Sequence, residues 1–256
     1  PTHRPFRTSA RYDAVVCDLD GCLGPESADC LDADGLARVA EHNRRAWKGR
    51  DRPMVTLCTG RPVPFVECLS RLIDNKLPVM AENGVWLWDP ATNVHERDPG
   101  ITPAHVRRVH EAQDWLEETY GPRGVTQQPG KTCSVSLYHP DHDYLHSITD
   151  EVREGLVNRL GLPFRVSATW FYINCDLDFV SKTTAIERFV RRTGIPHERL
   201  AGVGDTMPDL KIKDACAWFG CPGNAKDELK PHADFVAEAP MVEGVLEILA
   251  ALEAGR

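Results

Sequence analysis

The sequence lacks the features that would assign it to a membrane or exported class. No apolar run approaches the roughly 18 residues of a membrane-spanning helix. No apolar segment typical of a signal peptide stands at its beginning, and we find no internal repeat or low-complexity tract. We therefore expect a cytoplasmic protein without a membrane partner, in which residues 1–10 form a flexible lead-in.

Ordered cysteine patterns and a surplus of basic residues are missing as well. The nine cysteines are an odd number, follow no regular spacing and form no Cys-x-x-Cys pair. Neither a zinc site nor a disulfide framework is indicated, and a reducing setting is favoured. The formal net charge of -8 argues against broad nucleic-acid binding through the phosphate backbone. It leaves room for a small anionic substrate in a local positive pocket.

Strand-like and helix-like segments alternate at both ends of the chain. Apolar runs at residues 14–17, 54–58 and 78–81 are separated by segments with helical spacing. The same alternation returns with strand-like runs at 200–203, 216–219 and 235–237 and a closing helix at 242–252. This order predicts βαβ units, and hence an α/β fold with a Rossmann-like parallel sheet.

The middle of the chain has a different texture. It predicts, in order, a hairpin at 85–88 and 94–96, a helix from Thr102, a strand at 133–138, a helix through 145–160, and strands at 164–166 and 170–173. We interpret residues 85–175 as an inserted α+β module, and residues 1–84 and 176–256 as the two parts of the core.

Two carboxylates, Asp18 and Asp20, follow the first strand in the sequence Asp18-Leu19-Asp20-Gly21. Ligand crevices in open α/β sheets form at the carboxyl ends of the strands. Carboxylates held close together repel each other, and a bound divalent cation would relieve that repulsion. A solvated turn explains Asp and Gly about equally well.

Three further segments repeat this placement of polar residues after strands. Thr59-Gly60-Arg61-Pro62 suits either an anion cradle or an ordinary helix start. Lys182 opens a helix, where an ammonium opposes the helix dipole unless an anion is near, although surface lysines are common. Asp205 and Asp209 follow the strand at 200–203, and a charged helix start is again the alternative.

Taken together and in order, these motifs resemble the four motifs of the haloacid dehalogenase superfamily. The resemblance spans nearly the whole chain. The insert between the second and third motifs is similar to the larger cap of the Cof-type, sucrose-phosphate and mannosyl-phosphoglycerate phosphatases. Asn224 lies in a stretch that also resembles that subgroup. One departure is Pro208, which occupies the position where those relatives often carry asparagine.

The resemblance implies an Mg²⁺-dependent phosphatase acting on a small phosphorylated metabolite, either a sugar phosphate or a phosphoglycerate-type compound. Asp18 would be the nucleophile that forms an aspartyl-phosphate, and Asp20 the general acid and base. The metal would be held by Asp18, the backbone carbonyl of Asp20, and Asp205. The implied phosphate-binding and supporting residues are Thr59, Gly60, Arg61, Lys182, Asp209 and Asn224.

The leaving group would be selected by the cap. Ser134 and Ser136 share a face of the predicted strand by its period of two. With Lys131 and Thr132 they would meet a polar or acidic leaving group, although a solvent-facing strand edge is an alternative. Glu82 and Asn83 would line the rim with Arg61. Alternative functions are a phosphomutase, a phosphoglycolate phosphatase and a non-catalytic binding module.

Overall fold

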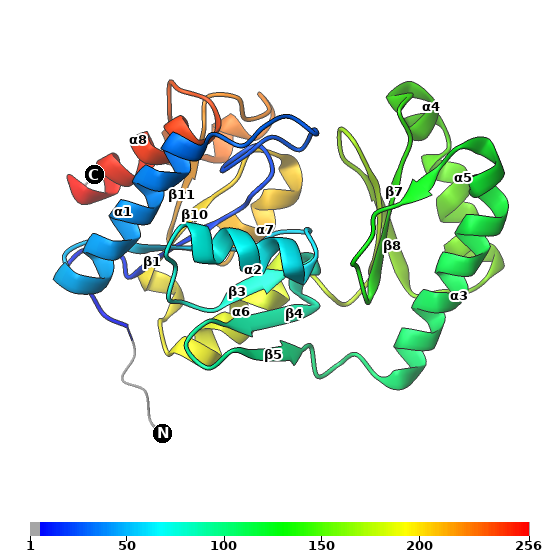
Figure 1. The fold of residues 1–256 in the computed structure, drawn as a ribbon, viewed down its shortest axis with the longest axis horizontal. Coiled ribbons are helices and arrows are strands. Elements are labelled where there is room, and N and C mark those ends of the chain that lie inside the picture. The colour runs from blue at the N-terminus through cyan, green and yellow to red at the C-terminus, as the bar shows by residue number, and fades with distance from the viewer. Residues whose placement is uncertain (1–5, 256) are drawn as a thin grey trace.

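The computed structural model describes residues 6–255 and consists of two bodies (Figure 1). The larger body contains a five-stranded parallel sheet in the order β12-β11-β10-β1-β2. These strands are β1 (Ala14–Cys17), β2 (Met54–Leu57), β10 (Leu200–Val203), β11 (Trp218–Cys221) and β12 (Phe235–Val236). The α/β fold with a parallel sheet is therefore confirmed.

Both faces of this sheet are covered by helices, as its apolar runs require. In β1, Val15 and Cys17 pack toward one helical layer, while Ala14 and Val16 pack toward the other. The first layer comprises α1 (Ala33–Gly49), α2 (Val63–Leu72) and α8 (Met241–Glu253), and the second comprises α6 (Lys182–Thr193) and α7 (Leu210–Lys213).

A short antiparallel sheet extends the larger body. Its strands are β3 (Val79–Ala81), β4 (Trp86–Asp89) and β5 (Val94–Arg97), and a parallel bridge from Cys58 to Met80 connects it to β2. Leu87 and Trp88 pack into the two clusters of the larger body. The division at residues 85 and 175 stays a prediction; from this packing, we propose that the cap begins after Arg97.

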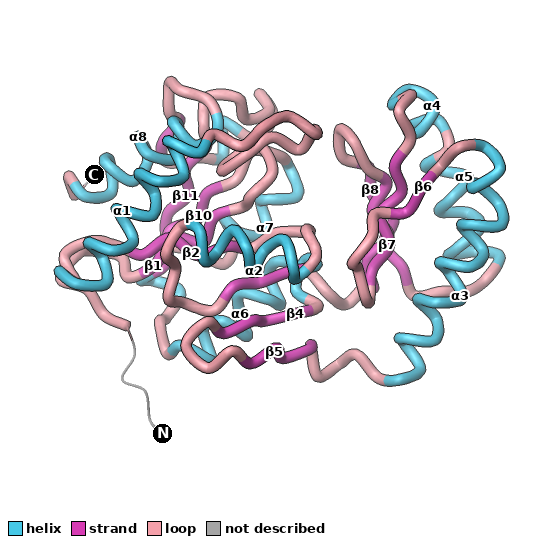
Figure 2. The backbone as a smooth tube through the Cα atoms, viewed as in Figure 1, coloured by secondary structure: helices cyan, strands magenta, loops and turns pink. Residues whose placement is uncertain are grey.

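The smaller body is a four-stranded antiparallel sheet in the order β6-β7-β9-β8 with helices on one face (Figure 2). Its apolar cluster is distinct from those of the larger body, although Val85 belongs to it and Trp86 packs both against it and against the parallel-sheet cluster. The other face of the sheet is turned toward the larger body (Figure 2). Its elements are α3 (Pro103–Tyr120), β6 (Thr126–Gln127), β7 (Ser134–Tyr138), α4 (His142–Ser147), α5 (Thr149–Arg153), β8 (Phe164–Ala168) and β9 (Ile173–Leu177).

Short helical turns complete the described chain. One is a π-helix, Glu154–Arg159. The others are the 3-10 turns Glu82–Gly84, Gly121–Arg123, His197–Arg199, Met207–Asp209 and Lys230–His232. Within residues 6–255, no helix combines the length and apolarity needed to cross a bilayer. The nine cysteines are free thiols.

Four local predictions are wrong. The strand expected at 170–173 begins at Ile173, because residues 169–172 form the turn of the β8–β9 hairpin. The strand expected at 216–219 is shifted to Trp218–Cys221, and the helix expected through 145–160 is interrupted at Ile148. Residues 6–10 are also not a flexible lead-in, because Phe6 is buried and stacks on Trp47. Residues 1–5 lie outside the described residues.

Candidate active site

A cavity of about 320 Å³ lies between the two bodies, at the carboxyl ends of β1, β2 and β10. It brings together residues from all four sequence motifs, which are separated by as many as 187 positions (205 minus 18) along the chain. The lining residues from the four motifs are Asp18, Asp20, Gly21, Thr59, Gly60, Arg61, Lys182 and Asp205. The structure thus brings residues of the four separate motifs to one cavity.

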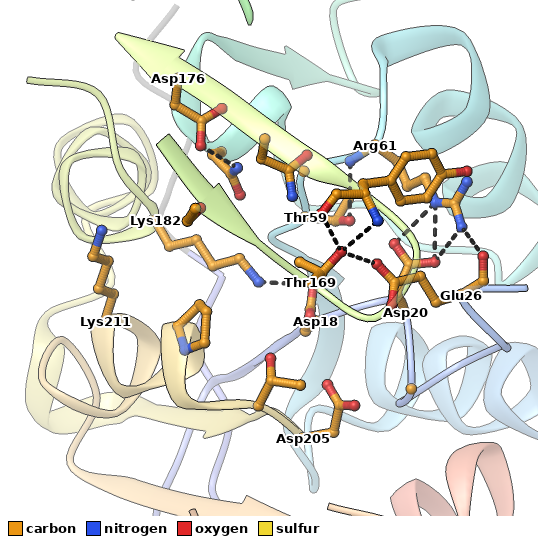
Figure 3. A pocket seen from close by; sticks show the side chains of 18 of the residues that line it. Asp18, Asp20, Glu26, Thr59, Arg61, Thr169, Asp176, Lys182, Asp205 and Lys211 are labelled. Atoms are coloured by element: carbon orange, nitrogen blue, oxygen red, sulfur yellow. Dashed lines mark hydrogen bonds and ion pairs between the residues drawn. The ribbon is translucent and has the colours of Figure 1, made fainter. Parts of the chain in front are cut away.

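Asp18 and Lys182 form a buried ion pair in this cavity (Figure 3). Asp18 directly follows β1, and Lys182 is the first residue of α6. The Nζ atom of Lys182 lies 2.9 Å from Asp18 Oδ1 and 2.7 Å from Asp209 Oδ1. An ammonium group at the start of a helix opposes the helix dipole unless an anion lies nearby. The carboxylates of Asp18 and Asp209 are such anions.

The burial of this pair changes the pKa of both groups. Burial raises the pKa of Asp18 to about 7, because the opposing effect of Lys182 is offset by Asp209 and Asp20. Burial alone would lower the pKa of Lys182, but Asp18 and Asp209 outweigh it and raise that pKa well above its ordinary value. Both carboxylates thus favour the charged form of Lys182, and a further positive charge near Asp18 would favour its ionised form.

Asp205 contributes a second half-buried carboxylate to the cavity. Burial raises its pKa to about 9, with Asp209 and Asp18 adding to the effect. A Cβ atom on Gly21 would lie 1.9 Å from Asp205 Oδ2, and Gly21 has a φ of +75°. The glycine of the first motif therefore allows Asp205 to approach the Asp18 loop closely.

These carboxylates fit a divalent cation. Ligand oxygens of Asp18, Asp205 and Asp209 all lie within 4.8 Å of one another. Asp209 already accepts from Lys182, and from the backbone N–H groups of Asp205 and Thr206. Asp18 and Asp205 therefore remain as the carboxylates best able to bind a hard cation, whose charge would lower both raised pKa values.

Asp20 faces Arg61 in this conformation (Figure 3). The Arg61 guanidinium donates through Nε at 2.9 Å and through Nη2 at 2.6 Å to the Asp20 carboxylate, and Nη2 also donates to the carbonyl of Glu26. Arg61 thus lines the cavity as expected, but its charge is directed at Asp20. Release of this pair would free both a carboxyl and a guanidinium for substrate.

Thr59 and Gly60 line the cavity next to the Asp20–Arg61 pair. The Thr59 hydroxyl accepts from the backbone N–H of Arg61 at 3.2 Å and does not cap α2, which begins after Pro62. A Cβ atom on Gly60 would lie 3.3 Å from the Asn83 amide. The glycine therefore allows Asn83 to pack against this edge of the cavity.

Two predicted site residues are absent from the cavity lining: Asp209, which contacts Lys182 from behind it, and Asn224. The side-chain amide of Asn224 donates to the carbonyl of Gly21 and accepts from the backbone N–H of Met241. Asn224 therefore supports the Asp18–Gly21 loop from outside. Pro208, in contrast, lines the cavity directly.

The cap face of the cavity contains residues that the sequence interpretation missed. These are Gln128, Arg165, Ser167, Thr169, Tyr172, Asn174 and Asp176. Arg165 and Ser167 alternate with buried Phe164 and Val166, so the period of two was a usable signal. From the larger body, Glu26 and Lys211 were also missed.

Of the predicted cap residues, only Lys131 lines the cavity. The backbone N–H and hydroxyl of Thr132, and the hydroxyl of Ser134, donate to the Glu82 carboxylate. Ser136 lies between Lys131 and Asn174, with hydrogen bonds to both. These hydroxyls therefore position the cap strand and its lysine, and the solvent-facing alternative is wrong because Ser134 and Ser136 are buried.

Comparison with known proteins gives a family match. The model of the haloacid dehalogenase-like hydrolases matches residues 107–249. The chain is 25% identical to a phosphoglycolate phosphatase from Thermoplasma volcanium over 237 residues, which cover 91% of this chain and 95% of the relative. It is 21% identical over 253 residues to the 5-amino-6-(5-phospho-D-ribitylamino)uracil phosphatase YcsE of Bacillus subtilis, covering 92% of this chain and 93% of the relative.

Solved structures share the fold. A Thermoplasma acidophilum protein superimposes with a TM-score of 0.73 at 18% identity, covering 94% of this chain and 98% of the other. The subclass IIB sugar phosphatase BT4131 gives a TM-score of 0.65 at 17% identity, covering 93% and 98%.

Proposed function

This chain belongs to the haloacid dehalogenase-like hydrolases and is a phosphoric monoester hydrolase, and from that premise we propose that it uses Asp18 as a covalent nucleophile. The supporting observation is the buried Asp18–Lys182 pair, which shares one cavity with Thr59 and Asp205. The proposed substrate is a small phosphomonoester, and the product an alcohol with inorganic phosphate.

In the first step, an Asp18 carboxylate oxygen attacks the phosphorus and the bond to the leaving oxygen breaks. Asp20 gives its proton to that oxygen, so the leaving group departs as a neutral alcohol. Asp20 must exchange its contact with Arg61 for a contact with the leaving oxygen. The released Arg61 is then close enough to pair with the substrate.

In the second step, water attacks the phosphorus of the aspartyl-phosphate. Asp20 takes the proton from that water, and the bond between phosphorus and the Asp18 oxygen breaks. This regenerates both carboxyl groups and releases phosphate. Transfer to a second hydroxyl in place of water would make the enzyme a phosphomutase, so release of free phosphate distinguishes the two.

Negative charge on the transferred phosphoryl group is stabilised by hydrogen-bond donors that the fold holds in place. We assign Lys182, the Thr59 hydroxyl and the Gly60 N–H to the phosphoryl oxygens, where negative charge spreads in the transition state. Asp209 positions Lys182 through the 2.7 Å contact. Mg²⁺, held by Asp18, Asp205 and the Asp20 carbonyl, would supply the additional positive charge that ionises Asp18 and neutralises the phosphoryl group.

Replacement of the nucleophile tests this function. We expect Asp18→Asn to remove phosphate release from p-nitrophenyl phosphate and from a panel of phosphorylated sugars and short acids. The fold should persist, because asparagine keeps the side chain's shape. Asp150→Asn, at an exposed carboxylate of α5, is the matched control and should retain activity. Robust turnover by the Asp18 variant would exclude Asp18 as the nucleophile.

Metal removal tests the proposed cation separately. We expect a chelator to abolish phosphate release and added Mg²⁺ to restore it, because Asp18 and Asp205 have raised pKa values without a cation. Activity that is unchanged in excess chelator would contradict the metal assignment while leaving the nucleophile assignment intact.

A further inference from the structure

One lysine from each body lines the cavity, and neither has a function in the steps above. Lys131 precedes β7 in the cap, and Lys211 belongs to α7 in the larger body. Both side chains are half-buried. Neither is close in sequence to Lys182, the lysine that pairs with Asp18.

Neither ammonium group has an anionic partner among residues 6–255. Lys131 Nζ donates to the Ser136 hydroxyl, which is neutral, and no carboxylate oxygen lies within 4.0 Å of it. Lys211 Nζ forms no ion pair or hydrogen bond with the described residues. A lysine ammonium has three donors, so most of this donor capacity faces the cavity unused.

Asp176 is the acidic residue of the cap that lines the cavity, and only one of its carboxylate oxygens is engaged, because the buried Oδ1 has no hydrogen-bond partner among the described residues. Asp176 Oδ2 accepts from the Asn83 amide at 3.0 Å and lies 3.5 Å from Arg165 Nη2. Glu82 is likewise committed to the backbone of Thr132 and Cys133. These acids reduce the local positive charge but do not neutralise either lysine directly.

Cations without partners in a partly dehydrated cavity are unfavourable. Burial lowers the pKa values of both Lys131 and Lys211. The negative charge of Asp176 raises both pKa values and so opposes the effect of burial. A bound anion would relieve this cost at both positions. Lys182 is already assigned to the phosphoryl group. The anion that we expect beside Lys131 and Lys211 is therefore a second charged group of the same substrate.

We propose that Lys131 and Lys211 form a subsite for a carboxylate on the leaving group. This inference rests on the proposed phosphatase function and narrows its substrates to phosphomonoesters of short hydroxy acids. A neutral sugar would leave both lysines unpaired. The cavity volume of about 320 Å³ is at the small end for ligand sites, which suits a two- or three-carbon acid.

Matched substrates test the subsite. 2-Phosphoglycolate and 2-hydroxyethyl phosphate both have a leaving group of two carbons. That leaving group has a carboxylate in 2-phosphoglycolate and a neutral hydroxyl in 2-hydroxyethyl phosphate. We expect kcat/KM of the wild-type protein with Mg²⁺ to favour 2-phosphoglycolate by about 10- to 100-fold, the range for a charge-assisted hydrogen bond.

Variants of the two lysines test whether these residues cause the preference for 2-phosphoglycolate. Lys131→Met and Lys211→Met should each reduce the preference for 2-phosphoglycolate by about 10-fold or more, chiefly through KM, and Lys131→Arg should restore part of it. Lys213→Met is the matched control, because Lys213 lies on the same helix as Lys211 but does not line the cavity.

Two outcomes would overturn the subsite. One is equal kcat/KM for the two substrates in a protein that hydrolyses both. The other is a strong preference for 2-phosphoglycolate that neither methionine variant reduces. Failure of the proposed function looks different, because the wild-type protein would then release no phosphate from either compound or from p-nitrophenyl phosphate.

Discussion

At the scale of single residues, the missing side chain of Gly21 determines how closely the two acidic loops approach. Asp205 occupies the volume that a Cβ atom at position 21 would need. Gly21 also has a positive φ, a conformation that residues with a side chain adopt at a cost. Both the backbone and the space at this position therefore require glycine.

Gly21→Ala should lower kcat/KM by about 100-fold or more, because Asp205 must move from the position that faces Asp18. Steady-state kinetics at saturating Mg²⁺ measure this. Gly161→Ala is the control, because Gly161 has a φ of +60° but nothing within 4 Å of its Cβ position. Equal activity losses in the two variants would show that backbone strain, and not contact with Asp205, is responsible.

Asp13 gives a residue-scale prediction about stability. Burial would raise its pKa, but hydrogen bonds from Arg199, Arg7 and Thr8 lower it below the ordinary value. Its ionised form therefore stabilises the fold at pH values above the unfolded pKa of 3.8, and this contribution is lost as the pH falls through the lower folded pKa. Asp13→Asn should lower the free energy of unfolding at pH 7 by about 2–3 kcal/mol.

The pH dependence provides the check on Asp13. Denaturant unfolding at several pH values should show the difference between the wild type and Asp13→Asn shrinking below about pH 4. A difference that stays constant from pH 7 to pH 3 would mean that ionisation of Asp13 is not the source of the stability.

At the scale of elements, the motifs of the larger body could be predicted because each depends on one strand and the loop after it. Asp18 follows β1, and Asp205 follows β10, as the apolar runs indicate. Parallel pairing then brings these loops to one edge of the sheet. Local sequence and one topological rule were sufficient to place these two loops, but not Glu26 and Lys211 of the same body.

The cap half of the site could not be predicted in the same way. The aromatic residues at 170–172 suggested a strand, but Trp170 lies in the hairpin turn and is 59% exposed. Asn174 and Asp176 in β9 are polar because they line the cavity. The polar face of β9 makes sense only once the larger body is known to lie opposite it. That arrangement depends on contacts between residues far apart in the sequence.

Glu82 provides an element-scale prediction, because it anchors the start of β7 to the larger body. Its carboxylate accepts from the backbone N–H groups of Thr132 and Cys133 at 3.0 and 3.1 Å. Glu82→Ala removes that acceptor, so hydrogen exchange at these two amides should become about 10- to 100-fold faster. Glu151→Ala, which removes an exposed pair with Arg123, should leave both amides unchanged.

At the scale of the whole molecule, the cavity exists only where two separately packed bodies meet. The turn of the β8–β9 hairpin reaches the larger body, where the Thr169 hydroxyl donates to Glu26 at 2.6 Å. Lys226 lies 4.3 Å from the centroid of the Trp170 ring. Together with the hydrogen bonds of Glu82 and Asn83 to the cap, these polar contacts are weak compared with the apolar clusters inside each body, so we expect that separation of the bodies costs less than unfolding either one.

Separate cores predict separate responses to core mutations. Leu156 and Ile248 are both fully buried, the first in the cap cluster and the second in the cluster beneath the parallel sheet. Replacing either with alanine should cost about 2–5 kcal/mol of packing free energy. Hydrogen exchange should localise that cost: Leu156→Ala should accelerate exchange in β7 and β9 but not in β1 and β10, and Ile248→Ala should do the reverse. If both variants accelerated exchange in all four strands equally, the two bodies would be one cooperative unit, and the cap could not open over the cavity without unfolding the protein.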